Sequence, residues 1–183
     1  MLESRVLEFN PDAILYVGHV AEAGFTLEDV AKAISYGAEI PYEEIRAIIR
    51  EADPQQDFSS KGSARARLAP YTNAMSEWAW SRIIRHCRDR GIAAYLAMIP
   101  STLRDPATPA QRAARVVEME RHGFIAFDLS AAFDVDLPAR ELVVAPWDAH
   151  PSALGQRLLA DTLYEQWHPH LSEARIRKAP GTQ

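Results

Sequence analysis

Three short apolar runs, separated by longer segments of helical apolar spacing, constrain the fold of this chain more than any other feature. Their length and continuous apolar character are typical of strands buried on both faces. The runs cover residues 12–18, 92–99 and 124–129. Apolar periodicity predicts helices over 26–36, 41–51, 72–90, 109–122 and 152–167. This alternation predicts an α/β fold with parallel strands joined by right-handed crossovers.

Local signals set the expected ends of these elements. Thr26 is expected to cap the first helix, and Ser152 the last. Residues 54–66 contain Gln, Ser, Lys and Gly and few apolar side chains, which predicts a mobile loop. Residues 130–134 are expected to form a helical turn, and residues 172–183 a polar, frayed C-terminal tail.

The composition argues against several classes of function. The net charge is −5 and the basic residues are scattered, so no nucleic-acid partner is expected. No apolar run approaches the roughly 20 residues of a membrane span, and residues 1–10 do not resemble a signal peptide. Cys87 is the only cysteine, so no intramolecular disulfide can form, and we expect a buried structural thiol. The cellular location stays open.

Polar residues follow the predicted strands at the end where parallel sheets bind ligands. These residues are Gly18-His19, Pro100-Ser101, Ser130 and, from a later loop, Asp148-Ala149-His150. Histidine is a suitable base near neutral pH, and a carboxylate two residues away in an extended loop can orient it. Pro151 restricts His150 to an extended backbone. The loop therefore predicts the acid and base of a nucleophilic hydrolase, although a helix cap with a surface ion pair would explain the same residues.

The segment from Ala145 to Ala160 resembles the last conserved block of the SGNH/GDSL hydrolases. That block contains Asp, one or two residues, His-Pro-Asn, then Gly-His and an apolar helix; here Ser152 and Gln156 replace the Asn and the second His. Residues 9–16 and 127–133 resemble two further strands of the family. The resemblance implies a three-layer, flavodoxin-like parallel sheet and an esterase triad in which Asp148 is the acid and His150 the base.

The chain departs from the family pattern in its N-terminal part. The family's first strand, with the Gly-Asp-Ser nucleophile, and its second strand, with an oxyanion-hole glycine, are not found in the sequence. Ala21 stands where the family has an Asn that donates to the oxyanion, which leaves Gly18 and His19 as candidate substrate-binding or oxyanion residues. No serine has the glycine neighbours of a nucleophile elbow, and this holds for Ser101, Ser130 and Ser152. We therefore expect this chain alone to be inactive.

The domain organisation follows from the same comparison. We expect one incomplete domain over residues 1–171 with a helical insertion at about 24–72, which is either a substrate-selecting lid or a packed crossover. Without the family's first strands, the strand at 12–18 would have an open apolar edge. We therefore expect either a fragment of a longer protein or a short form that pairs as a homodimer through that edge.

Two alternatives to an esterase stay open. A non-catalytic binding or scaffold protein on the same fold is favoured by the missing serine and by Ala21. A zinc site could use His168 and His170 with His150 and Asp148, although a helix cap explains the first two histidines equally well. As an esterase the protein would act on a small-molecule, carbohydrate or lipid ester, and no cofactor or metal is expected.

Overall fold

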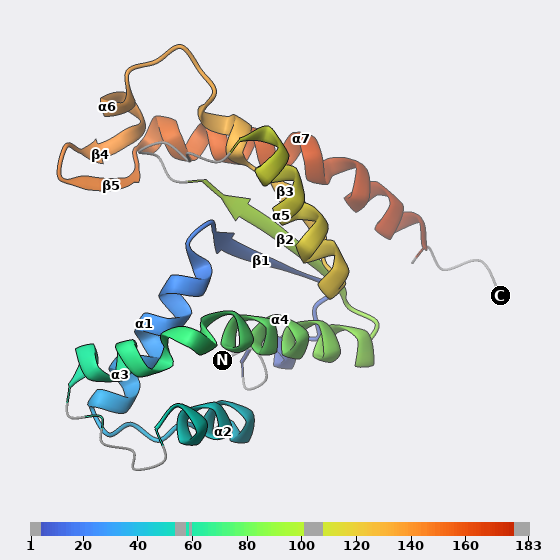
Figure 1. The fold of residues 1–183 in the computed structure, drawn as a ribbon. Helices are drawn as coiled ribbons and strands as arrows, with labels where there is room; N and C mark the ends of the chain where they lie inside the picture. Colours follow the sequence, from blue (N-terminus) through green and yellow to red (C-terminus); the bar gives the residue numbers. More distant parts are fainter. Residues whose placement is uncertain (1–4, 54–57, 59, 101–107, 178–183) are drawn as a thin grey trace. The chain divides into compact units, whose positions relative to one another are not determined.

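The computed structural model describes residues 5–53, 58, 60–100 and 108–177, with side chains as far as residue 170. The chain forms two compact units. One combines Met1–Asp12 with Ala21–Ile92, and the other combines Ala13–Val20 with Ala93–Gln183. The first consists of helices and the second contains a parallel sheet (Figure 1), so the predicted α/β class is confirmed.

The sheet of the second unit has three parallel strands. β1 (Ala13–His19), β2 (Ala93–Ile99) and β3 (Ile125–Asp128) pair in the order β1-β2-β3. Each end lies within one residue of its prediction, because a continuous apolar run is a strong signal for a buried strand. Among the described residues β1 pairs only with β2, so its other edge is open.

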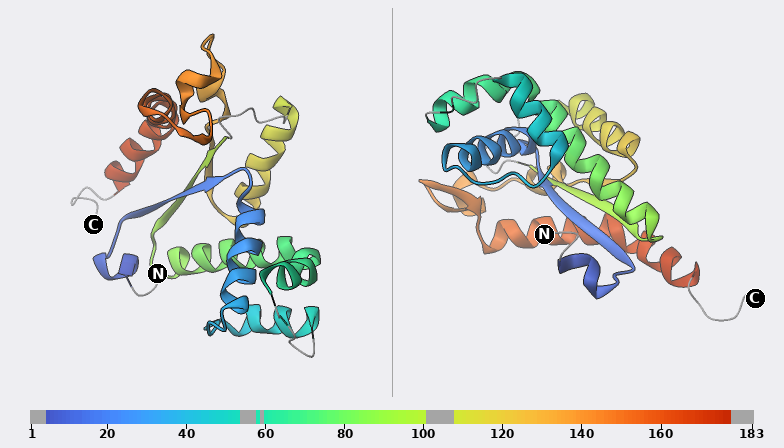
Figure 2. Two further views of the ribbon diagram at one scale, coloured as in Figure 1. Left: turned by 90° about the vertical axis from the view of Figure 1, so that its left-hand side faces the viewer. Right: turned by 90° about the horizontal axis from the view of Figure 1, so that it is seen from below.

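One face of the sheet packs against α7 (Ala153–Arg177). Alternate residues of a strand point to the same face, so Leu15, Tyr95 and Phe127 gather in one apolar cluster with Leu159 and Trp167 of the helix. The rings of Tyr95 and Trp167 have centroids 5.5 Å apart. α5 (Pro109–His122) lies on the opposite side of the sheet (Figure 2). The second unit therefore places helices on both faces of its sheet.

The first unit is built from helices around an apolar core. Its elements are η2 (Leu7–Phe9), α1 (Glu22–Ser35), α2 (Glu43–Ala52), α3 (Lys61–Leu68), η3 (Ala69–Tyr71) and α4 (Thr72–Asp89). The buried core residues are Leu27, Ala31, Ile45, Ile49, Ala64, Leu68 and Met75. The segment predicted as an insertion, 24–72, supplies all of these except Met75.

Two local predictions in the first unit are wrong. Thr26 does not cap a helix: α1 begins at Glu22, and the Thr26 hydroxyl donates to the Glu22 carbonyl at 3.1 Å. A threonine hydroxyl can bond the carbonyl four residues earlier, so it does not always mark a helix start. Residues 61–66 of the predicted loop belong to α3, which Ser60 caps. Residues 54–57 and 59 of that loop lie outside the described residues.

Two salt bridges and a buried apolar face attach the polar helix α3 to its unit. Glu28 of α1 accepts from Lys61 and Arg65 of α3, each at 2.5 Å. These contacts join two helices at the surface, and Ala64 and Leu68 bury the apolar side of α3 in the core, so tertiary packing stabilises a helix whose sequence is mostly polar. A prediction based on apolar content alone therefore identified this segment as a loop.

The C-terminal part agrees with the predicted helical turn, but the predicted frayed tail is wrong over residues 172–177. η4 (Ser130–Phe133) is the predicted helical turn, and α5 ends at Gly123, whose φ of 106° favours glycine. α7 continues through Pro169 to Arg177, so residues 172–177 of the predicted tail are helical. Between η4 and α7 lie α6 (Ala139–Leu142) and a β-hairpin that carries the predicted acid and base.

Candidate active site

The predicted acid and base lie on a short antiparallel hairpin. β4 (Val143–Ala145) pairs with β5 (Asp148–Pro151), with Ala145 opposite Asp148. The hairpin lies on the side of the sheet to which the arrowheads of β1 and β2 point (Figure 1). This is the side on which parallel sheets bind ligands. The sequence predicted an extended loop here but not its pairing, because β4 has three residues and β5 has four.

Asp148 and His150 are joined by two hydrogen bonds to the same carboxylate oxygen. His150 Nδ1 lies 2.5 Å from Asp148 Oδ1, and the His150 backbone N–H donates to that oxygen at 3.0 Å. A carboxylate can only accept, so Nδ1 carries the proton and Nε2 is the free basic nitrogen when the ring is neutral. This is the tautomer that a histidine base needs in a Ser-His-Asp triad.

The ionisation of Asp148 favours a role of His150 as a base. Hydrogen bonds from the backbone N–H and then the ring of His150 lower the pKa of Asp148, against the opposing effect of desolvation. The carboxylate is therefore ionised at neutral pH and can stabilise an imidazolium. The His150 side chain is 86% exposed and that of Asp148 is 40% exposed. The ring of His150 forms its hydrogen bond with Asp148 Oδ1.

Ser152, directly after β5, bonds to the end of α6 and caps the start of α7. Its backbone N–H donates to the Leu142 carbonyl at 2.9 Å, and its hydroxyl donates to the Glu141 carbonyl at 2.6 Å. The same hydroxyl accepts from the Gly155 N–H at 3.2 Å, which confirms its predicted role as a helix cap. Both ends of the segment that carries His150 are therefore fixed by hydrogen bonds.

Glycine is required at position 155 because the Leu142 carbonyl lies close to it and leaves no room for a side chain. A Cβ atom at this position would lie 2.6 Å from the Leu142 carbonyl oxygen and 3.2 Å from Pro151 Cβ. One residue further along, the side-chain amide of Gln156 donates to the Pro151 carbonyl at 3.2 Å. These contacts place the first turn of α7 directly against the hairpin.

Gly18 and His19 lie at the end of β1. Gly18 is buried near the end of β1 beside Met98, and His19 lies beside Ile99 at the same end of the sheet. The Val20 N–H donates to the Ile99 carbonyl at 3.2 Å, which continues the hydrogen bonding between β1 and β2 just past the end of β1. Ala21 is the N-cap residue of α1 and belongs to the helical unit. The two candidates therefore lie at the predicted sheet edge.

The candidate serines do not complete a triad within the described part of the chain. Ser130 is buried, and its hydroxyl donates to Asp128 Oδ1, which also accepts the Ser130 backbone N–H at 2.8 Å. The hydroxyl of Ser152 is committed to the Glu141 carbonyl. Ser101 lies outside the described residues.

The histidines considered for zinc have other surroundings. The ring of His168 lies 5.1 Å from that of Tyr164, and the ring of His170 lies 5.5 Å from that of Phe127, measured between centroids. Within the described ranges, no three histidine, cysteine or acidic residues are arranged to hold a metal ion. The proposed zinc ligands are thus not brought together there.

Exposed apolar residues that were not predicted from the sequence lie beside the acid and base. Trp147 is 88% exposed in the turn between β4 and β5, and Val144 of β4 is 59% exposed. Large apolar side chains exposed near a polar site are candidates for ligand or partner contact. The sequence does indicate an apolar residue at this site, because Trp147 directly precedes Asp148.

Comparisons with protein-family models, curated proteins and solved structures found no match to this chain. The function is therefore inferred from the site itself. Of the helices described, none is both long and apolar enough to cross a membrane.

Proposed function

We propose that Asp148 and His150 are the acid and base of an ester hydrolase of the SGNH/GDSL type, whose serine nucleophile lies outside the described residues. The observation that supports this most is the 2.5 Å contact between His150 Nδ1 and Asp148 Oδ1. It fixes the ring in the tautomer that presents Nε2 as a base, on a hairpin held by Ser152. The resemblance of residues 145–160 to the family's last block gives the same two residues these roles.

The mechanism needs two proton transfers at His150. As a serine hydroxyl attacks the ester carbonyl, Nε2 takes the hydroxyl proton while the new C–O bond forms. The imidazolium then gives that proton to the leaving alkoxide, and the acyl–serine ester forms. Water attacks this ester in a second cycle, with Nε2 again acting first as base and then as acid. Asp148 remains ionised throughout and stabilises the charged ring.

We also propose the finer fold of that family, a flavodoxin-like sheet in which another strand adjoins the open edge of β1. The parallel order β1-β2-β3 and helices on both faces support this arrangement. A strand at that edge would end on the same side of the sheet as the hairpin if it ran parallel to β1. The nucleophile would then reach the side on which His150 lies.

A fluorophosphonate probe tests the proposed nucleophile. Applied to the whole product of the native gene, it should form an Oγ–phosphorus bond with one serine and release fluoride, and peptide mapping should find that serine outside the described residues. Labelling should be slowed in the His150→Ala variant and unchanged in His168→Ala, which removes an exposed histidine of the same unit. No labelling, or labelling independent of His150, would contradict the proposal.

The second candidate function is a non-catalytic binding protein on the same fold. It is favoured by the hydrogen bonds that occupy the hydroxyls of Ser130 and Ser152. This candidate predicts no labelling by the probe even in the native gene product.

A further inference from the structure

The helical unit contains a pocket that takes no part in the proposed ester hydrolysis. It has a volume of about 390 Å³ and lies between the end of α1, the connection over residues 36–42, the helix α2, and Phe58. Ligand sites for small molecules typically have volumes of about 300–1,000 Å³. All of its lining residues belong to the unit that does not carry Asp148 and His150.

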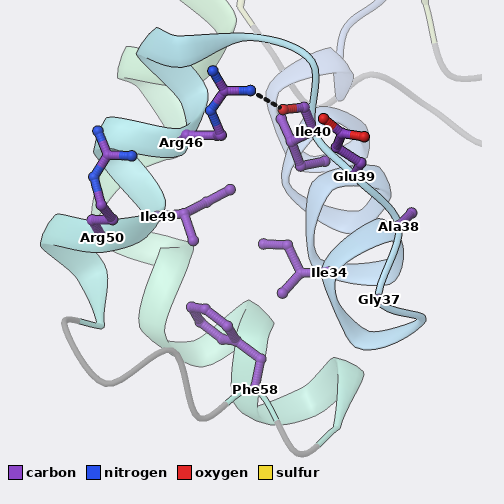
Figure 3. A pocket seen from close by; sticks show the side chains of 9 residues that line it. All are labelled: Ile34, Gly37, Ala38, Glu39, Ile40, Arg46, Ile49, Arg50 and Phe58. Atoms are coloured by element: carbon purple, nitrogen blue, oxygen red, sulfur yellow. Dashed lines mark hydrogen bonds between the residues drawn. The ribbon is translucent and has the colours of Figure 1, made fainter.

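The floor of this pocket is apolar. Figure 3 shows the side chains of Ile34, Ile49 and Phe58 converging from different segments on its centre. Ile49 is buried in the core of the unit, whereas Ile34 and Phe58 are partly buried. These side chains offer a ligand only apolar surface. They are therefore suited to contact a hydrocarbon chain.

Two arginines on successive turns of α2 form one wall of the pocket (Figure 3). Both bind the carboxylate of Glu43: Arg46 Nη2 lies 2.6 Å from Oε2, and Arg50 Nη2 lies 2.6 Å from Oε1. The two arginines hold the pKa of Glu43 below its usual value, with the hydrogen bond from Arg50 as the largest cause. Glu43 is therefore ionised at neutral pH and neutralises only one of the two guanidinium charges.

The two arginines differ in their remaining hydrogen-bond donors. Arg46 uses Nε and Nη2 on Glu43 and Nη1 on the Ile40 carbonyl at 2.8 Å, so it fixes the connection to α2. Arg50 bonds Glu43 only through Nη2, and its Nε and Nη1 donate to no other described residue. Its side chain is 49% exposed. A guanidinium with spare donors beside an apolar floor is suited to a ligand carboxylate.

We propose that this pocket binds a small monocarboxylate with an apolar tail, such as a medium-chain fatty acid. The tail lies among Ile34, Ile49 and Phe58, and the carboxylate accepts from Arg50. Glu39 also lines the pocket, so the four charged groups Glu39, Glu43, Arg46 and Arg50 sum to zero. Recognition therefore comes from the directed donors of Arg50, and a second carboxylate at the other end of the tail would have to enter the apolar floor, which weakens binding.

Calorimetric titration of the whole chain with octanoate tests this site, with octanol and octanedioate as comparison ligands. We expect octanoate to bind most tightly. Affinity should rise about fourfold for each methylene from hexanoate to octanoate, because each buried methylene adds a similar increment of apolar surface. Equal binding of octanoate and octanol, or no binding of octanoate, would overturn the proposal.

Two variants test the charged part and the apolar part of the pocket separately. Arg50→Gln should weaken octanoate binding about tenfold or more and leave octanol binding unchanged, because it removes only the charged donor. Ile34→Phe should weaken both ligands by filling the centre of the pocket. Arg88→Gln, at an exposed position of α4 away from the pocket, is the matched control and should change neither. Unchanged octanoate binding in Arg50→Gln, whose position is half-exposed and tolerant of substitution, would contradict the site regardless of how Ile34→Phe folds.

Discussion

The Oδ1 atom of Asp148 accepts both the ring Nδ1–H and the backbone N–H of His150, at 2.5 and 3.0 Å. One oxygen thus fixes the position of the residue and the orientation of its ring. Because the His150 side chain is 86% exposed, its orientation depends on this oxygen rather than on packing.

Replacement of Asp148 by Asn should therefore release the ring without unfolding the hairpin. The Asn carbonyl can still accept the backbone N–H, but it carries no charge to favour the Nδ1–H form. We expect two-bond ¹⁵N correlation spectra of neutral His150 to show the Nδ1–H tautomer in the wild type and a mixture of both tautomers in Asp148→Asn. A wild-type ring with its proton on Nε2 would show that the ring is oriented in another way.

Gly155→Ala should destabilise the second unit. The new Cβ would lie 2.6 Å from the Leu142 carbonyl oxygen, so α6 and α7 would have to move apart. We expect the free energy of unfolding to fall by about 1–3 kcal/mol in urea titrations. Gly24→Ala is the matched control, because nothing lies within 4 Å of a Cβ at that helical position, and it should stabilise by up to about 1 kcal/mol. Equal effects of the two substitutions would disprove the close approach.

The network around Glu28 should make stability depend on pH in the acid range. The hydrogen bond from Lys61, with the charges of Lys61 and Arg65, lowers the pKa of Glu28 from its usual 4.5. A carboxylate whose pKa is lower in the folded state stabilises the fold above 4.5, and this contribution is lost as pH falls through the folded-state pKa. Glu28→Gln should therefore destabilise the protein at neutral pH and have little effect near pH 3.

The control for this effect is Glu44→Gln. Glu44 is exposed on α2, and no ion pair joins it to another residue in the described ranges. Urea titrations of both variants at neutral and acid pH provide the comparison. A loss of stability in Glu28→Gln that is the same at both pH values would indicate a packing role instead.

Cys87 should react slowly with alkylating reagents in the folded protein. It is 2% exposed on α4, and desolvation raises the pKa of its thiol despite the opposing charge of Arg90. Both effects reduce the amount of accessible thiolate, which is the reactive form. Iodoacetamide labelling should become rapid only when urea unfolds α4. Rapid labelling under native conditions would show that this part of the core opens readily.

The sheet could be predicted from the sequence because its strands are buried on both faces. Runs such as 92–99 contain almost no polar residues, and few structures other than a buried strand show this pattern over so short a length. The hairpin could not be predicted in the same way, since β4 and β5 are too short to show a two-residue period. The helix α3 was missed because its contacts are distant in sequence: Ala64 and Leu68 pack in the core of the unit, and Lys61 and Arg65 pair with Glu28, more than thirty residues earlier.

The acid and base could be predicted as a pair, but their supports could not. Asp148 and His150 are close in sequence, so their spacing and Pro151 limit where they lie. The carbonyls of Glu141 and Leu142, which hold Ser152, belong to a segment that has no signal of its own. Arg46 and Arg50 follow Glu43 at spacings of three and seven residues, which place all three on one side of a helix. That pattern is visible in the sequence and indicates the arginine wall of the pocket.

The most direct test of the central claim is the hydrolysis of short-chain aryl esters by the whole product of the native gene, compared between wild type and His150→Ala. If His150 is the base, kcat should fall about 10³-fold or more, while His168→Ala retains wild-type turnover. Hydrolysis that persists in His150→Ala, or a wild-type protein that hydrolyses no ester, would contradict the assignment of Asp148 and His150 as a catalytic acid and base.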